Sequence, residues 1–223
     1  MAPPRKHDTD RILDAARTIA LRDGPRATSV AAIAAESGAP AGTLYHRFGS
    51  RDRLLQEAWL RALGRFQGAV LAAAGGAHGD PADGGDPADG GDPVEAVDPV
   101  EAVEAVDAVE AGVAMAGAAI AFASARPDDA RLLAAVRRSD LLDGGADPDF
   151  TARLAEINAP LEAAFDGIAR ALGRTNPPRR EVVIAAVVDL PGAAIRRHAR
   201  EGATMPAWLE ESVAASARRL LTA

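Results

Sequence analysis

The 223-residue chain contains no cysteine, which excludes a disulfide framework and a thiolate metal site. Its net charge of −7 would argue against a nucleic-acid binder, but the acidity lies in one segment. Residues 75–111 hold eleven acidic and no basic residues, whereas residues 1–60 carry a net charge of +2. The first ten residues are polar and charged, and the most apolar run, 111–125, is shorter than a membrane span. We therefore expect a cytoplasmic protein with no signal peptide and no membrane partner.

The first predicted helix covers residues 9–23. Thr9 is the expected N-cap, and Gly24 is expected to end the helix. Apolar residues at spacings of three and four predict one buried stripe along it. This stripe consists of Ile12, Ala16, Ile19 and Ala20.

A second helix, a tight turn and a third, short helix are predicted for residues 28–53. Thr28 or Ser29 suits the N-cap of the second helix, because their hydroxyl groups accept hydrogen bonds from backbone amides. Gly38 then ends that helix, since glycine takes the positive φ that such an end requires. Pro40 fits the first turn of the next helix.

The third helix has two chemically different faces. Leu44 and Phe48, one turn apart, are expected to hold it against the second helix. The other face combines short polar groups, one flat ring and cations, which suits a DNA groove and its phosphates better than a hydrophobic contact. It carries Thr43, Tyr45, His46 and Arg47.

These segments resemble the DNA-binding domain of the TetR family of transcriptional repressors. The sequence GTLYHRF at 42–48, followed by SRDRLL at 50–55, is similar to the recognition helix of that family and the start of its fourth helix. ILDAA at 12–16 is similar to the first helix, and the resemblance covers residues 8–60 in detail. The chain departs from the family at Ala20 and Pro25, where aromatic residues are usual, and at Ala39, where valine is usual.

The resemblance implies a set of DNA contacts around the third helix. Small residues at its start would let the backbone approach base edges, and Tyr45 and His46 would touch phosphates. Thr28 lies at a helix N-terminus, which favours a phosphate, and arginines add charge. The expected contacts are Thr28, Ser29, Ala41, Gly42, Thr43, Tyr45, His46, Arg47 and Arg51. A solvated surface position is the alternative for each arginine.

The rest of the chain predicts long helices and no strand. We expect an all-α protein of about nine helices: an N-terminal three-helix helix-turn-helix DNA-binding domain at 1–55, and a C-terminal helical ligand-binding and dimerisation domain at 56–223. The later helices are expected at 51–74, 99–125, 128–142, 148–172, 179–201 with a kink at Pro191, and 206–221.

Between two of these helices lies a repeat of six residues. DPADGG begins at Asp80 and recurs at Asp86, and its dense Pro and Gly predict a flexible acidic loop over 75–98. Carboxylates and glycines could also build a Ca²⁺ loop, but the spacing does not fit the twelve-residue EF-hand pattern. We therefore expect a linker, no metal and no cofactor.

The resemblance also implies where a small-molecule effector and a second subunit would bind. Its ligand pocket would lie among helices four to seven, although each candidate is also a plausible core residue. The pocket candidates are Trp59, Phe66, Met115, Phe122, Arg137, Asn158 and Phe165. A homodimer would form through the last two helices, whose apolar residues cover more than one face. The interface candidates are Val183, Val187, Ile195, Trp208, Leu209, Val213 and Leu220.

Three functional hypotheses follow. The first is a homodimeric repressor that binds a palindromic operator in double-stranded DNA and is released by an effector. The second is a DNA-binding regulator without an effector, acting as a constitutive repressor or an activator. The third is an effector-binding protein that has lost DNA binding, suggested by Ala20, Pro25 and Ala39. An enzyme is not expected, because the four histidines are scattered and no nucleophile or phosphate-binding motif is present.

Overall fold

The structure, a computed structural model, describes residues 6–76, 99–141, 147–173 and 179–223, and within these ranges it is helical with no strand. The α-helices are α1 (Lys6–Asp23), α2 (Val30–Ser37), α3 (Ala41–Phe48), α4 (Arg51–Gly76), α5 (Pro99–Ala125), α6 (Pro127–Ala135), α7 (Pro148–Ala171), α8 (Arg179–Ile184), α9 (Leu190–Glu201) and α10 (Leu209–Thr222). A 3₁₀ turn, η1 (Arg138–Leu141), follows α6, and a π-helical turn, η2 (Ala185–Asp189), joins α8 to α9. Because α8, η2 and α9 are continuous, the described ranges hold nine separate helices, and the predicted all-α fold is confirmed.

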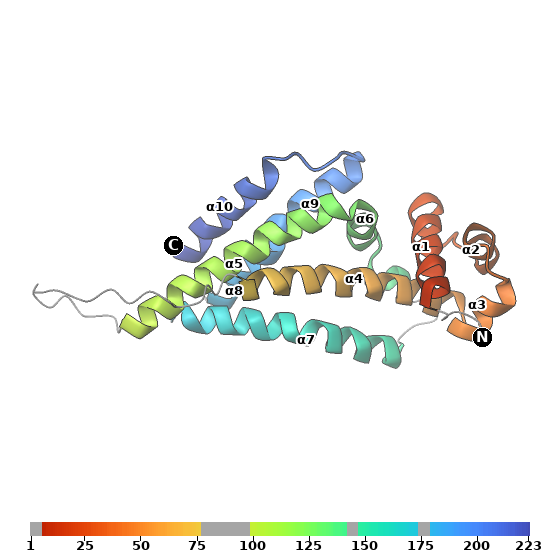
Figure 1. The fold of residues 1–223 in the computed structure, drawn as a ribbon, viewed down its shortest axis with the longest axis horizontal. Coiled ribbons are helices and arrows are strands. Elements are labelled where there is room, and N and C mark those ends of the chain that lie inside the picture. The colour runs from red at the N-terminus through yellow and green to blue at the C-terminus, as the bar shows by residue number, and fades with distance from the viewer. Residues whose placement is uncertain (1–5, 77–98, 142–146, 174–178) are drawn as a thin grey trace, which may run out of the picture.

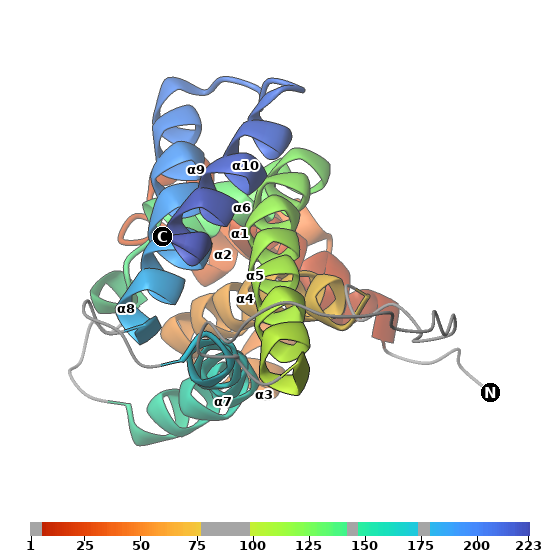
Figure 2. The ribbon, with the colours of Figure 1, turned by 90° about the vertical axis from the view of Figure 1, so that its left-hand side faces the viewer.

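Helix α4 connects the two parts of the molecule (Figure 1). The first three helices form a head at one end of it, and α5 to α10 form a body around the remainder. In the body, α5 packs against α4 and α7 on one side and against α9 and α10 on the other (Figure 2). A movement of α4 in the body would therefore reach the head directly.

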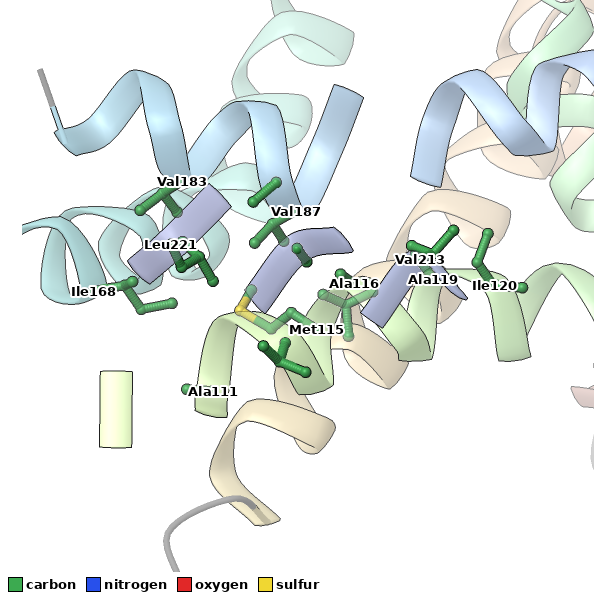
Figure 3. Packing of buried hydrophobic residues seen from close by; sticks show 14 of the residues in the cluster. Ala111, Met115, Ala116, Ala119, Ile120, Ile168, Val183, Val187, Val213 and Leu221 are labelled. Atoms are coloured by element: carbon green, nitrogen blue, oxygen red, sulfur yellow. The ribbon is translucent and has the colours of Figure 1, made fainter. Parts of the chain in front are cut away.

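Each part has its own hydrophobic core. The body core is centred on α5, where Met115 and Ala116 are fully enclosed and meet Val187 and Val213 (Figure 3). The head core begins with Ile12, Ile33 and Leu44, but it continues into side chains of α6, η1 and α7. These further residues are Leu132, Val136, Leu141, Phe150 and Leu154. The small head is thus completed by the body, as a three-helix unit of about 50 residues requires. The predicted domain boundary after residue 55 lies inside α4.

Helix α5 contains a long apolar segment. Its Ala105–Ala125 segment is 21 residues long with a mean hydropathy of 1.6, which is long and apolar enough to cross a membrane. This span is longer than the 111–125 run identified from the sequence. However, 61% of its 18-residue apolar window is buried inside the protein, as in the core helix of a folded domain.

Helix α10 lies close against α5. A β-carbon at Gly112 would come 2.6 Å from Leu221 Cδ1, so this contact requires a glycine unless Leu221 moves. Two residues before Gly112 on α5, Glu110 pairs with Arg218 of α10. This guanidinium lowers the pKa of the Glu110 carboxyl, chiefly through its hydrogen bonds.

The predicted helix over residues 128–142 is shorter than expected. Helix α6 ends at Ala135, and Val136 is extended, with φ −98° and ψ 113°. Leaving the helix lets Val136 and Leu141 both turn into the head core, and Leu141 O accepts a hydrogen bond of 3.1 Å from Gln56 Nε2. Asp140 holds the following turn by accepting a hydrogen bond from Arg137 N. These long-range contacts outweigh the helical periodicity of the segment.

Two other local expectations need correction. Thr9 is not an N-cap, because α1 begins at Lys6; its hydroxyl instead accepts a hydrogen bond of 2.7 Å from Arg47. The irregularity expected at Pro191 lies just before it, in η2, where Leu190 N donates to Ala185 O. A proline lacks the N–H of a regular helix, and a π-helical turn absorbs that loss. The predicted acidic loop lies almost wholly at 77–98, outside the described residues.

Candidate functional site

The turn between α2 and α3 follows the predicted local chemistry. Ser29 caps α2 by accepting a hydrogen bond of 3.1 Å from Ala32 N. Gly38 ends that helix with φ +70°, a conformation that side chains disfavour. Pro40 lies at the N-cap of α3, one residue earlier than predicted. The turn therefore fixes the direction in which α3 leaves the head.

Helix α3 buries one face and exposes the other. Leu44 and Phe48 enter the head core, as predicted. On the outer face Thr43 and His46 are exposed, and 56% of Tyr45 is accessible to solvent. Tyr45 is therefore available to a DNA backbone, to which tyrosine side chains donate hydrogen bonds. The exposed face also begins with Ala41 and Gly42, and no acidic residue lies in the first turn of α3.

Three of the predicted DNA contacts are already engaged within the chain. The hydroxyl of Thr28 is buried and donates to Gly24 O at 2.9 Å. Arg47 is half-buried and donates to Thr9. Arg51 donates to Thr28 O at 2.7 Å and to Pro25 O, and pairs with Asp52. In this conformation Thr28 and Arg51 hold the turn before α2, while Arg47 ties α3 to α1.

Two exposed arginines of the head were not among the predicted contacts. Arg26 lies in the turn before α2, and the guanidinium of Arg11 lies over Gly38, 3.3 Å from the position of a β-carbon there. Arg11 thus lies near the start of α3, and Arg26 adds a charge to the turn before α2. Their distance from the GTLYHRF motif explains why the sequence did not point to them.

A cavity of about 300 Å³ lies in the body between α4, α5, α6, α7 and α9. Four of the seven predicted pocket residues line it: Trp59, Phe66, Phe122 and Phe165. Asn158 does not line the cavity itself, but its Oδ1 accepts a hydrogen bond of 2.7 Å from Nε2 of the lining residue Gln67. The other two candidates lie elsewhere, because Met115 is enclosed in the body core and Arg137 is exposed beside η1.

Gln67 and Arg196 also line the cavity, although neither was predicted. A signal for Gln67 was present in the sequence. It occupies an apolar position of α4, at the spacing of Leu60, Leu63 and Val70, and a polar residue in such a stripe is unusual in a plain core. Arg196 comes from a distant helix, and only the fold brings it to this place.

Helix α6 touches both the cavity and the head. Ala130 and Leu133 line the cavity, and Asp129 beside them is only 2% exposed. Asp129 pairs with Arg17 of α1 and, at 3.3 Å, with Arg65 of α4. These ion pairs, which we call the Asp129 cluster, link α6 to α1. A helix that lines the cavity is therefore joined to the head by charged side chains.

Some of the predicted interface residues are buried within the chain, and others are exposed. Five of them pack inside their own chain and therefore expose little surface to a partner: Val183, Val187, Ile195, Leu209 and Val213. Trp208 and Leu220 remain exposed, and Val188 is a further exposed apolar residue. No group of three or more His, Cys, Asp or Glu that could hold a metal ion is found in the described part of the chain.

Residues 12–58 match the family described as bacterial regulatory proteins, tetR family. No curated protein has a matching sequence. Among solved structures, the chain is similar over its whole length to a TetR-like transcriptional regulator from Rhodococcus sp. RHA1, with 19% identity, 97% of that chain covered and a TM-score of 0.61.

Two other solved regulators have the same fold. A TetR family transcription regulator from Marinobacter aquaeolei VT8 is 16% identical, with 96% of this chain and 94% of that chain covered and a TM-score of 0.65. The transcriptional regulator FadR from Bacillus subtilis, solved in complex with stearoyl-CoA, is 13% identical, with 95% and 96% covered and a TM-score of 0.63. The whole chain therefore has the fold of TetR-family transcriptional regulators.

Proposed function

We propose that this chain, which carries the N-terminal domain of the tetR family of bacterial regulatory proteins, is a cytoplasmic homodimeric repressor released from operator DNA by a small molecule. The observation that supports DNA binding best is the outer face of α3, where Tyr45 and His46 project into solvent beside the small residues 41–43. A helix with this surface fits the major groove.

Two such heads would read a palindrome. A dimer would place its two α3 helices about 34 Å apart, one helical turn of DNA. Exposed Ser29, Thr43, Tyr45 and His46 are the contacts we favour, with Ala41 and Gly42 allowing close backbone approach. Arg47 and Arg51 would act indirectly, by stabilising the fold of the head through their hydrogen bonds within the chain. Arg11 and Arg26 would add phosphate contacts.

The effector would act through α4 and α6. Both helices line the cavity, and both form ion pairs with α1: Asp129 of α6 pairs with Arg17, and Arg61 of α4 pairs with Asp14. A ligand that prefers a wider cavity would favour a conformer with differently spaced heads, which needs only different affinities for the two states. The FadR structure supports a ligand-binding body, but stearoyl-CoA is far larger than a cavity of about 300 Å³.

The other two hypotheses are less favoured. A regulator without an effector would not need a cavity walled by four aromatic side chains. Loss of DNA binding was suggested by Ala20, Pro25 and Ala39. In the fold Pro25 O accepts a hydrogen bond from Arg51, Ala20 is buried in the head core, and Ala39 packs against that core. None of these departures removes a group from the exposed face of α3.

Operator titrations test the DNA contacts. We expect Tyr45→Ala and His46→Ala to weaken binding to all sequences by about 1 to 3 kcal/mol, because phosphate contacts carry no sequence information. Thr43→Val should instead change the preferred bases. Gel shifts against the chain's own upstream region, then against selected sequences, measure both effects.

The matched control for these titrations is Arg131→Ala, which removes an exposed cation from α6 in the body. It should leave operator affinity within a factor of two, because its helix α6 lies on the other side of α1 from α3 (Figure 1). Unchanged affinity in Tyr45→Ala and His46→Ala would remove the proposed role of α3.

A further inference from the structure

The cavity gathers an unusual share of the aromatic residues of the chain. Only eight of the 223 residues are Trp, Tyr or Phe, and four of these line this one cavity: Trp59, Phe66, Phe122 and Phe165. Phe66 and Phe122 meet edge to face, with ring centroids 5.4 Å apart. Aromatic walls of this kind pack favourably against another ring. About 300 Å³ is room for a compact ligand.

Gln67 brings an unsatisfied polar atom to this apolar wall. The residue is only 4% exposed, and its Nε2 donates to Asn158 Oδ1. Its Oε1 is buried and has no hydrogen-bond partner among the described residues. Rotating both amides would exchange their roles and leave the Gln67 amide nitrogen unsatisfied instead. In either orientation a ligand hydroxyl, which both donates and accepts, satisfies the group.

Trp59 supplies a second unsatisfied group. Its Nε1 is buried without a hydrogen-bond partner in the described part of the chain, and the residue lines the same cavity. Trp59 precedes Gln67 by eight residues on α4, or about 12 Å along the helix axis. A buried polar atom without a partner needs an explanation, and two residues that carry one line this cavity, which favours a polar ligand there.

Arg196 places a positive charge at the rim. Its side chain is exposed, lines the cavity, and has no ion pair within the described ranges. Its Nη1 lies 3.0 Å from the position of a β-carbon at Gly192, another lining residue, so the guanidinium lies over the cavity edge. An arginine at such a rim suits a carboxylate, which it binds through two parallel hydrogen bonds.

We propose that the ligand is a compact aromatic carboxylate that carries a hydroxyl group. Its ring lies among Phe66, Phe122 and Phe165, its hydroxyl bonds to Gln67, and its carboxylate faces Arg196 at the rim. This proposal rests on the proposed function, since it takes the cavity to be the effector site. It specifies what that site recognises, which the function alone does not.

Calorimetric titration of the full-length protein with three matched probes tests the assignment. The probes are 6-hydroxy-2-naphthoate, 2-naphthoate and 2-naphthol, which differ only in the hydroxyl and the carboxylate. We expect the wild-type protein to bind 6-hydroxy-2-naphthoate about tenfold more tightly than 2-naphthoate, because only the former satisfies Gln67. Gln67→Met keeps the length of the side chain without the amide and should bring this ratio to about one.

The carboxylate is tested separately at the rim. Arg196→Gln should weaken both naphthoates about tenfold and leave 2-naphthol unchanged. The matched control is Arg197→Gln, which removes the neighbouring exposed arginine of α9 that does not line the cavity. This control should bind all three probes as the wild-type protein does.

Several outcomes would overturn the ligand assignment. One is that the wild-type protein binds the two naphthoates with equal affinity, as expected if water alone satisfies Gln67. Another is that the tenfold ratio of the two affinities persists in Gln67→Met. Thermal melts check that Gln67→Met folds, and Gln67→Leu replaces it if it does not. A protein that binds operator DNA but none of the probes would contradict this inference alone. One that binds the probes as expected but no DNA would contradict only the proposed function.

Discussion

Arg51 shows how a single side chain can differ from its sequence-based interpretation. It was predicted to contact DNA because it follows the recognition motif and carries a charge. In the fold its guanidinium turns back to the carbonyls of Pro25 and Thr28. An arginine at the start of a helix has the same sequence signature whether it faces solvent or its own chain. Only the tertiary position of the preceding turn decides between the two.

Arg51→Ala is expected to lower the free energy of unfolding by about 1 to 3 kcal/mol, because two backbone carbonyls lose their donor. Urea denaturation measures this change. The matched control is Arg53→Ala, which removes an exposed arginine two residues later whose ion pair in the described part of the chain is with exposed Asp149. It should cost less than about 0.5 kcal/mol. If Arg51→Ala left stability unchanged but abolished operator binding, Arg51 would be a direct DNA contact after all.

The helices themselves were largely predictable, since apolar spacing and capping residues are local signals. Helix α5 was predicted at 99–125 and is found at Pro99–Ala125. The end of α6 was not predicted correctly. Val136 leaves the helix to pack in the head core, and this contact joins segments that are far apart in the sequence. The residues of the cavity were likewise predictable only in part. Their aromatic side chains suggested a pocket from the sequence. However, the spacing of apolar residues could not distinguish Phe122, which lines the cavity, from Met115, which lies in the body core.

Helix α6 provides the second prediction about stability. Asp129→Asn keeps the shape of the side chain but leaves Arg17 and Arg65 without their shared buried anion. Removing one member of a buried pair costs about 3 to 5 kcal/mol. Both arginines reach solvent partly, so we expect about 2 kcal/mol here, measured by urea denaturation.

The control for the Asp129 cluster is the adjacent residue. Asp128→Asn removes an exposed carboxylate whose only ion pair in the described part of the chain is a 3.8 Å contact with Arg131. It should change the free energy of unfolding by less than about 0.5 kcal/mol. Equal effects of the two substitutions would mean that Asp129 contributes no more than a surface charge and does not link α6 to the head.

At the scale of the whole molecule, the proposed homodimer needs apolar surface that the chain itself leaves exposed. The sequence pointed to the last two helices because their apolar residues cover more than one face. The fold accounts for most of this excess within one chain, since Val187 and Val213 pack against α5 (Figure 3). Three apolar side chains of this region remain exposed, those of Val188, Trp208 and Leu220. Sequence periodicity counts apolar faces but does not say whether a neighbouring helix or a partner covers each one.

Trp208 is the residue on which a dimer through α9 and α10 should depend most. It is 60% exposed, and tryptophan is enriched among the residues that dominate interface energies. Trp208→Glu places a charge there and is expected to weaken dimerisation at least tenfold, as measured by sedimentation velocity over a range of concentrations. Operator affinity should fall with it, because a single head reads too short a site.

Val106→Glu is the matched control, since Val106 is 61% exposed on α5. A Trp208→Glu protein that stayed dimeric would place the interface elsewhere, and a monomeric wild-type protein that still bound its operator tightly would remove the need for one.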